Sequence, residues 1–350
     1  MGNSASPVTM RTLADQLGVS VTTVSNAYSK PDRLSPELRD QILARAKELG
    51  YCGPSAAGRA LRSGRTDVCG FLFGGDLARA FADPYTVTFL AGLSESVERF
   101  GGSVLLLRSP GEGEEDSESQ LLQRAAIDAI VTCSAVSEHP ATELLSQRGV
   151  RVVGAQRSPE GEWVAVNDEK AGRLIGKHLA KLGHQRVVVV VRGESPDGEP
   201  FDVAPDQILA IGGLFAVERI QGLTEKLPNA SIRVVCGGQN TRQAGRAAAA
   251  FVLDEQNRPT AIVALSDLLA LGVWDAARER GLKPGRDLSI TGFDDLPEAA
   301  FVGLTTVRQP IIDKGRLAGR LAMDPDYPQR QITLPVELIV RASTGPAPRR

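Results

Sequence analysis

Residues 8–28, VTMRTLADQLGVSVTTVSNAY, contain two short helical patterns separated by a glycine. Thr9 can cap the first helix. The apolar residues of that helix recur at helical spacing: Met10, Leu13, Ala14 and Leu17. Gly18 ends it, and Ser20 can cap a second helix that we expect to extend from Val21 to about Tyr28. Two short helices joined by a glycine-containing turn are typical of a helix-turn-helix, so the stretch predicts this motif.

A third helix is predicted in RLSPELRDQILARAKELGY (33–51). Its start, Ser35-Pro36-Glu37, supplies a cap, a first-turn proline and an acid near the positive helix end. Residues 54–66, PSAAGRALRSGRT, then predict one short helix of small residues with a single large apolar side chain. An isolated helix below about 12 residues is marginal in water, so we expect this segment to become ordered on binding.

Charge is distributed unevenly along the chain. Residues 1–65 carry nine Lys/Arg and five Asp/Glu, a net charge of +4, whereas residues 66–350 carry 31 and 37, a net charge of −6. A basic N-terminal part on an acidic body favours contact with a polyanion such as DNA. Taken alone, the same features also fit a solvated surface or a small protein-docking module.

The three quoted stretches resemble the lactose-repressor/galactose-repressor (LacI/GalR) family of bacterial transcription regulators, and the resemblance continues over about residues 8–345. It implies that residues 54–63 form a hinge helix that pairs with its dimer mate in the minor groove. In that arrangement Leu61 is the wedging side chain and Ala57 lies beside it against the bases. It also implies a pseudo-palindromic operator in double-stranded DNA. The C-terminal TGPAPRR contains no leucine heptad, so we expect a homodimer and no tail-mediated tetramer.

Val21, Thr22 and Asn26 match the principal base-reading positions of the family. The family often has arginine at position 26, and asparagine there favours adenine over guanine. Thr23 fits a phosphate contact as well as a base contact. The predicted DNA-binding residues are Thr9, Val21, Thr22, Thr23, Ser25, Asn26, Ala57 and Leu61.

From Asp67 onward, apolar runs alternate with helical stretches. We expect strands at 68–73, 103–107, 129–132, 151–155, 186–191, 232–236, 261–265 and 289–293, and helices near 86–100, 117–126, 169–182, 241–254, 267–280 and 311–323. Near-continuous apolar strands alternating with helices indicate parallel sheets covered on both faces. The predicted fold class is therefore α/β: a three-helix helix-turn-helix head with a hinge helix, then a two-lobed body of doubly wound parallel sheets. The family implies that this body is like a periplasmic binding protein.

The predicted boundaries follow from these patterns. The head comprises 1–53, the hinge and linker 54–65, the effector-binding and dimerisation body 66–345, and the tail 346–350. Within the body we assign about 66–165 plus 310–323 to an N-lobe, and about 166–309 plus 324–345 to a C-lobe. The loops 110–118 and 192–206 are expected to be mobile surface, and the second is long enough to cover the cleft.

Ligands of parallel sheets bind at the carboxyl ends of the strands. Carried over residue by residue, the effector pocket of the family falls on Asp83, Tyr85, Ser134, Gln156, Arg219, Asn240, Asp267, Asp294 and Gln309. Gln156 replaces a common aspartate and Asn240 replaces an aromatic residue, so the hydrogen bonding of the pocket is altered. Arginine and aspartate in one cleft suit vicinal hydroxyls. A sugar is the expected ligand, followed by a nucleoside or another polar metabolite.

No cofactor, metal site or catalytic residue is expected. The body contains no GxGxxG after its first strand, no P-loop and no GxSxG, and its few histidines and scattered cysteines do not favour a metal site. The pair Asp294-Asp295 fits a carboxylate metal site less well than a simpler role, in which Asp295 caps a helix. No apolar run approaches the ~18–20 residues of a membrane span and the first residues do not form a signal peptide, so we expect a cytoplasmic protein.

The predicted function is that of a sequence-specific DNA-binding regulator, most simply a repressor, whose operator affinity changes when a small polar molecule binds the body. A free-standing sugar-binding receptor is the first alternative, and a hydrolase or transferase on the same fold is the second. The basic head disfavours the first alternative, and the missing catalytic motifs disfavour the second.

Overall fold

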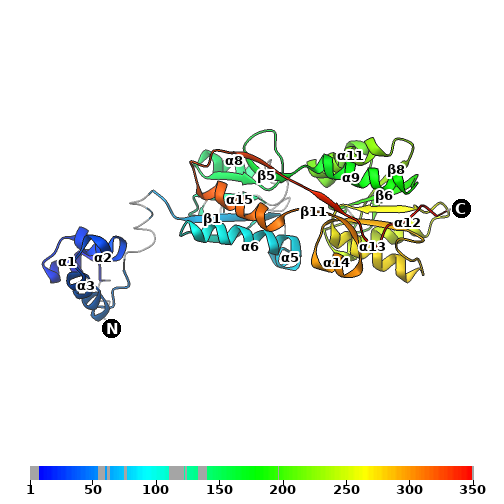
Figure 1. Ribbon diagram of the computed structural model, residues 1–350. Coiled ribbons are helices and arrows are strands. Elements are labelled where there is room, and N and C mark those ends of the chain that lie inside the picture. Colours follow the sequence, from blue (N-terminus) through cyan, green and yellow to red (C-terminus); the bar gives the residue numbers. More distant parts are fainter. Residues whose placement is uncertain are drawn as a thin grey trace. The chain divides into compact units, whose positions relative to one another are not determined.

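A computed structural model describes residues 8–53, Ala60, 64–74, 77–109, Leu122, 124–132, 140–195 and 197–348. The chain divides into two compact units, Met1–Thr66 and Asp67–Arg350, which are described separately (Figure 1). Three predicted functional residues, Ala57, Leu61 and Ser134, lie outside the described residues.

The first unit is a three-helix head. Its elements are α1 (Met10–Leu17), α2 (Val21–Ser29), the 3-10 turn η1 (Pro31–Arg33) and α3 (Pro36–Glu48). The N-caps of the three α-helices are Thr9, Ser20 and Ser35, each of which accepts a hydrogen bond from the backbone N–H three residues later. Gly18 ends α1 with a left-handed backbone (φ 65°). The predicted helices and caps of the head are confirmed.

One small apolar core holds the head together. It consists of Leu13, Ala14, Val24, Ala27, Ile42 and Ala46, two residues from each α-helix. Tyr28 and Tyr51 pack edge to face beside it, with ring centroids 6.0 Å apart. Every helix therefore depends on the other two for its burial, and the angle between α1 and α2 is fixed by α3.

The second unit, the body, begins with a six-stranded sheet that forms the first lobe. The strand order is β12-β5-β4-β3-β1-β2, and every pair is parallel. The strands are β1 (Val68–Gly74), β2 (Ser103–Ser109), β3 (Ala129–Thr132), β4 (Arg151–Gly154), β5 (Glu162–Val166) and β12 (Gln331–Leu334). The helices of this lobe are α5 (Leu77–Ala82), α6 (Pro84–Arg99), α8 (Pro140–Gln147) and α15 (Ile311–Met323).

The second lobe contains a seven-stranded sheet of order β13-β11-β10-β9-β6-β8-β7. Only the pairs made by the edge strands β7 and β13 are antiparallel. The strands are β6 (Arg186–Val191), β7 (Phe201–Asp202), β8 (Ser231–Cys236), β9 (Ala261–Ala264), β10 (Ser289–Asp294), β11 (Thr305–Arg308) and β13 (Glu337–Ile339). Around them lie α9 (Asp168–Lys181), η3 (Pro205–Gln207), α10 (Ile208–Gly212), α11 (Leu214–Lys226), α12 (Arg242–Leu253), α13 (Asp267–Glu279) and α14 (Pro297–Val302).

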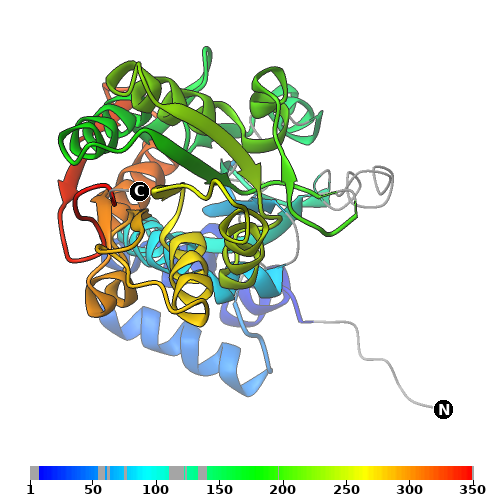
Figure 2. The ribbon, with the colours of Figure 1, turned by 90° about the vertical axis from the view of Figure 1, so that its right-hand side faces the viewer.

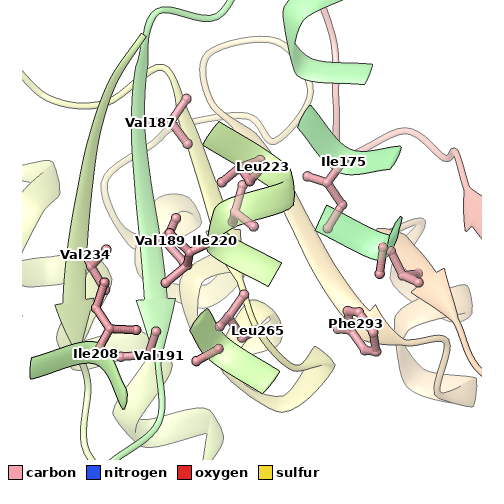
Figure 3. Close-up of a cluster of buried hydrophobic side chains, with 14 of the residues drawn as sticks. Ile175, Val187, Val189, Val191, Ile208, Ile220, Leu223, Val234, Leu265 and Phe293 are labelled. Atoms are coloured by element: carbon pink, nitrogen blue, oxygen red, sulfur yellow. The ribbon is translucent and has the colours of Figure 1, made fainter. Parts of the chain in front are cut away.

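Two apolar clusters cover the two faces of the second sheet. In Figure 2, α9 and α11 (green) lie on one side of it and α12 and α13 (yellow) on the other. Figure 3 shows the cluster beneath α9 and α11, where Val187, Val189 and Val191 of β6 lie beside Ile220 and Leu223 of α11. Alternate residues of β6 pack into one cluster and the other. Both faces of the strand are therefore buried, which accounts for its continuous run of valines.

The eight predicted strands are confirmed, and four of the predicted helices correspond closely to α6, α9, α12 and α13, while α15 has the predicted bounds. The predicted helix at 117–126 falls mostly outside the described residues. The assignment of all of 324–345 to the C-lobe is wrong, because β12 pairs with β5 in the sheet of the first lobe. The 192–206 segment, which was expected to be mobile surface, contains β7 and the start of η3.

The chain passes between the lobes three times. It crosses from β5 to α9, from β11 to α15 and from β12 to β13, and Figure 1 shows these segments running between the two sheets. Each lobe is therefore built from segments that are far apart in the sequence. The crossings also bring side chains of the connecting segments to the space between the lobes.

Glycines let three helix pairs pack with their backbones in close approach. A Cβ on Gly245 of α12 would lie 2.0 Å from the carbonyl oxygen of Leu269 in α13, and one on Gly272 of α13 would lie 2.0 Å from that of Arg242. Gly92 of α6 and Gly315 of α15 allow the same close approach between these two helices. The pair α9 and α11 repeats the arrangement with Gly172 and Gly222.

We therefore expect Gly245→Ala to lower the free energy of unfolding of the body by about 1–3 kcal/mol, because the added methyl group forces α12 and α13 apart. Urea denaturation followed by circular dichroism measures the change. Arg278→Ala is the control, since Arg278 is exposed on α13 and its truncation should shift stability by no more than about 0.5 kcal/mol. Equal stability of Gly245→Ala and the wild type would show that the close approach of the two helices is not required.

Candidate functional site

The exposed side of α2 gathers the predicted base-reading residues. Val24 and Ala27 face the head core, whereas Val21 is 39% exposed, Thr22 is exposed and Asn26 is half-buried. Thr22 and Asn26 are four residues apart and therefore share one face of the helix. The first two turns of α2 thus present a hydroxyl and an amide on one face, and the branched apolar group of Val21 is exposed at the start of the helix.

Other predicted DNA contacts have a role within the head. The hydroxyl oxygens of Thr23 and Ser20 are 2.8 Å apart, and Ser20 also accepts the backbone N–H of Thr23. Thr9 forms a capping box with Thr12. The carbonyl of Ser25 accepts a hydrogen bond from the Ser29 hydroxyl at 2.8 Å. The bonds of Thr9 and Ser20 fix the N-terminal ends of α1 and α2, whereas the bond between Ser29 and Ser25 lies in the last turn of α2.

The head also carries exposed basic side chains. Those that the structure describes as exposed are Arg11, Lys30, Arg33, Arg39 and Lys47. Arg45 is held within the head, since it pairs with Glu48 at 2.7 Å and donates to Gln16 at 3.1 Å. The remaining cations are available to phosphates, which supply most of the sequence-independent affinity of DNA-binding proteins.

A cavity of about 350 Å³ lies between the two lobes of the body. Seven of the nine predicted effector residues line it: Asp83, Tyr85, Gln156, Arg219, Asn240, Asp294 and Gln309. Ser134 lies outside the described residues. The prediction that Asp267 contacts the effector is wrong, because this side chain is fully buried and does not line the cavity.

Asp267 has a structural role in the second lobe. Its carboxylate accepts the backbone N–H of Leu296 at 2.8 Å and the hydroxyl of Thr306 at 2.7 Å. Burial raises the pKa of Asp267 to about 6, although the two hydrogen bonds oppose the shift. It therefore joins the start of α13 to β11 and to the segment before α14.

Several wall residues were not predicted from the sequence. They include Phe73, Arg79, Asp168, Arg192, Phe215 and Lys314. Phe73 belongs to β1 and Arg192 directly follows β6, so a search of all strand ends would have found them. Arg79, Phe215 and Lys314 are on helices, where nothing in the local pattern separates a wall residue from a surface residue.

A buried ion pair joins the first crossing segment to the second lobe. Arg219 donates from Nε to the Oδ1 of Asp168 at 2.7 Å and from Nη1 to the carbonyl oxygen of Leu265 at 2.7 Å. Its guanidinium lies 3.3 Å from the ring centroid of Phe293 and 4.8 Å from that of Phe215. The arginine is 8% exposed and Asp168 is 5% exposed, so the pair is desolvated and each member depends on the other.

Asp294 and Gln309 form a second buried polar pair at the wall. The amide nitrogen of Gln309 donates to Asp294 at 2.6 Å, while the amide oxygen Oε1 of Gln309 is buried without a hydrogen-bond partner in the described part of the chain. Asp294 has a positive φ of 124°. Burial raises the pKa of Asp294 well above its usual range, and the nearby carboxylate of Asp267 raises it further, whereas Arg219 opposes the shift.

The first lobe contributes Asp83, Tyr85 and Lys314. Asp83 caps α6 by accepting the backbone N–H of Tyr85 at 3.0 Å, and its other oxygen accepts the Thr86 hydroxyl at 3.1 Å. Burial raises the pKa of Asp83, against the effect of these bonds and of Arg192 across the cleft. The ammonium of Lys314 donates to the hydroxyl of Tyr85 at 3.1 Å.

The neighbouring Asp295 does not cap a helix as predicted. The N-cap of α14 is Leu296, while Asp295 has a left-handed backbone (φ 59°) and pairs with Arg308 and Arg341, both at 2.6 Å. Its carboxylate thus ties β11 to the segment after β13. Among the described residues, no group of three or more His, Cys, Asp or Glu side chains is arranged to hold a metal ion.

We expect Asp294→Asn to gain stability relative to the wild type as the pH rises. Burial raises the pKa of Asp294 in the folded state, so the wild type loses stability as the pH increases from about 4 through the folded-state pKa, and a neutral amide does not. Urea unfolding midpoints at pH 4.5, 6 and 7.5 measure the difference. In the control Asp254→Asn the difference from the wild type should stay constant over this pH range, because Arg280 lowers the pKa of Asp254 and the resulting stabilisation is lost only below about pH 4. A difference for Asp294→Asn that does not change with pH would contradict the expectation.

Comparison with known proteins places these features in a family. Residues 177–344 match a family model described as a periplasmic binding protein-like domain. An HTH-type transcriptional regulator of Mycolicibacterium smegmatis is 34% identical over 331 residues, which are 91% of this chain and 90% of that protein. None of the described helices is both long and apolar enough to cross a membrane.

Two solved structures cover almost the whole chain. A LacI-family transcriptional regulator from Corynebacterium glutamicum has a TM-score of 0.69 and 26% identity, covering 97% of this chain and 98% of its own. The lac repressor dimer bound to operator has a TM-score of 0.76 and covers 97% of this chain and 99% of its own; at 22% identity it shows the common fold. The chain, with its helix-turn-helix head and two-lobed body, belongs to the LacI/GalR family of HTH-type transcriptional regulators.

Proposed function

We propose that the chain acts as a homodimeric regulator, most simply a repressor, of genes controlled by a pseudo-palindromic operator in the cytoplasm. A small polar effector, by default a sugar, binds the cavity of the body and changes the affinity of the head for DNA. The observation that carries this proposal is the cavity, whose wall combines side chains of both lobes with residues of the segments that cross between them.

The chemistry of the wall suits a hydroxylated ligand. The carboxyl of Asp294, the amide of Gln309 and the guanidinium of Arg219 provide acceptors and donors that can bind neighbouring hydroxyls. The rings of Phe73 and Phe215 supply apolar surface for the carbon face of the same molecule. Since the relatives of this chain are regulators, we propose that the cavity binds its ligand without transforming it.

The effector can change the angle between the lobes because it contacts residues at two of the crossings. Asp168 directly follows the crossing from β5, and Gln309 lies in the crossing from β11 to α15. A ligand that binds one angle between the lobes more tightly than another shifts the population toward that angle. Coupling of this kind is typically ~1–3 kcal/mol and reciprocal, so operator DNA changes effector affinity by the same factor.

The head transmits this change to DNA through the proposed hinge. We propose domain boundaries of 1–53 for the head, 54–65 for the hinge and 66–345 for the body. In the dimer, a change of lobe angle alters the spacing of the two hinges, so that Ala57 and Leu61 enter the minor groove only when the hinges are in register. Thr9, Thr23 and Ser25 complete the proposed DNA contacts beside the base-reading residues of α2.

An electrophoretic mobility shift with the DNA upstream of the chain's own gene tests the function. We expect a complex of two chains per operator that withstands excess unrelated DNA, and a metabolite that changes its affinity about 5- to 150-fold, the range of typical allosteric coupling. Failure of the purified chain to prefer any sequence in a selection from random DNA would overturn the proposal.

The base-reading surface allows a sharper prediction. Asn26→Ala should weaken binding to the preferred operator by ~1–3 kcal/mol and relax the preference at one base pair in each half-site. The matched control is Gln41→Ala, which truncates an exposed amide on α3 outside the proposed contact set. Fluorescence anisotropy with operators substituted at single positions measures both variants. An equal loss for all operators would make Asn26 a phosphate contact.

A further inference from the structure

One ion pair joins the two lobes beside the cavity. Arg157 lies in the loop between β4 and β5 of the first lobe, and Glu218 lies on α11 of the second. Nη1 of Arg157 is 3.6 Å from Oε1 of Glu218. No other ion pair between described residues links a side chain of the first lobe to one of the second. This contact therefore depends directly on the angle between the lobes.

The geometry of the pair is incomplete. At 3.6 Å the two charges attract each other, but they are too far apart for a hydrogen bond between them. The second carboxylate oxygen of Glu218, Oε2, is buried and has no hydrogen-bond partner among the residues that the structure describes. A buried charged acceptor without a donor is costly. A guanidinium that came closer would supply the donor, because arginine can donate to both oxygens of one carboxylate.

The charges around Glu218 also favour a closer approach of Arg157. Burial raises the pKa of Glu218, Arg157 and Arg219 oppose that shift, and the carboxylates of Asp168 and Glu169 add to it. Arg219 is already paired with Asp168 at 2.7 Å. Of the two cations, Arg157 is therefore the one that can compensate Glu218 more fully by moving toward it.

An aromatic ring ties the position of Arg157 to the first lobe. The guanidinium of Arg157 lies 5.7 Å from the ring centroid of Trp163 in β5, within the range of a cation–π contact. Trp163 is 6% exposed, so the sheet holds its ring in place. The side chain of Arg157 is 40% exposed, which leaves it room to turn toward Glu218. When the lobes approach each other, Arg157 thus moves toward Glu218 together with the first lobe.

Both members of the pair are next to cavity residues in the sequence. Gln156 and Arg219 line the cavity, whereas their neighbours Arg157 and Glu218 do not. A molecule that contacts Gln156 of the first lobe and Arg219 of the second draws the same two backbone segments together. Closure of the cavity and shortening of the ion pair are therefore parts of one movement.

We propose that Arg157 and Glu218 form a closing contact, in which the guanidinium donates to both carboxylate oxygens of Glu218 when the lobes approach each other across the cavity. This contact stabilises the closed arrangement and sets how much of the chain is closed before an effector binds. An ion pair of this exposure shifts such an equilibrium by up to about fivefold. The proposal deepens the proposed function and rests on it only in taking the cavity as the effector site.

Distances between two spin labels in the full-length chain measure the angle between the lobes. The labels are attached at Gln147→Cys on α8 of the first lobe and at Lys177→Cys on α9 of the second, both exposed positions. Cys52 and Cys133 are replaced by serine in every sample, and the two remaining cysteines are buried. Dilution with unlabelled chain restricts the measured distances to those within one copy.

We expect Arg157→Ala and Glu218→Gln each to lower the population of the distance closest to the lobe arrangement of this structure by about two- to fivefold. The double variant should shift the distribution no further than either single variant, because all three remove the same contact. The matched control is Arg246→Ala, which breaks an ion pair with Glu279 at 3.0 Å within the second lobe and should leave the distribution unchanged.

Two results would overturn the proposal. One is an unchanged distribution in both Arg157→Ala and Glu218→Gln, and the other is a shift in the double variant that equals the sum of the two single shifts.

The spin-label measurement requires neither DNA nor effector, so its outcome is separable from that of the proposed function. If the distances respond as expected but the chain prefers no DNA sequence, the closing contact stands and the proposed function fails. If the chain binds its upstream DNA but the distances respond to neither variant, the regulator stands and the closing contact fails.

Discussion

The buried ion pair between Arg219 and Asp168 is the interaction on which the body most depends. Asp168 begins α9, where the chain first enters the second lobe, and Arg219 also binds the residue after β9 and packs on Phe293 of β10. One side chain thereby joins a crossing segment to two central strands of the second sheet. Removing either partner leaves a buried charge uncompensated, which typically costs ~3–5 kcal/mol. The pair therefore forms part of the cavity wall and holds the start of α9 against the second sheet.

The fold could be predicted where local sequence determines it. The head follows from caps at Thr9, Ser20 and Ser35, and the central strands follow from apolar runs that both faces of a sheet require. The edge strands β7, β12 and β13 were not predicted, because they are two to four residues long and become strands only through their neighbours. The inner strands β5 and β11, of five and four residues, were not predicted either. The same tertiary pairing places β12 in the first lobe, which no pattern within 331–334 indicates.

The cavity could be predicted less completely than the fold. Family resemblance predicted seven wall residues correctly. Arg79 and Lys314 were not predicted, because the sequence around a cation on a helix looks the same whether its side chain faces solvent or a cavity. Asp267 shows the converse. Its position after a strand is that of a ligand contact, yet its carboxylate is directed to the backbone of Leu296 and to Thr306. Sequence gives the place of such a residue along the strand but not the direction of its side chain.

The three crossings between the lobes have a consequence for how the protein is made. The first sheet needs β12 and the second needs β13, and both strands follow every other strand in the sequence (Figure 1). Neither lobe can complete its sheet until residues 331–339 have left the ribosome, whereas the head can fold as soon as residues 8–53 emerge. During synthesis, a folded DNA-binding head is thus attached to two unfinished sheets with open edges. Those edges expose unpaired backbone N–H and C=O groups that can aggregate, so we expect chaperones to bind the nascent chain there.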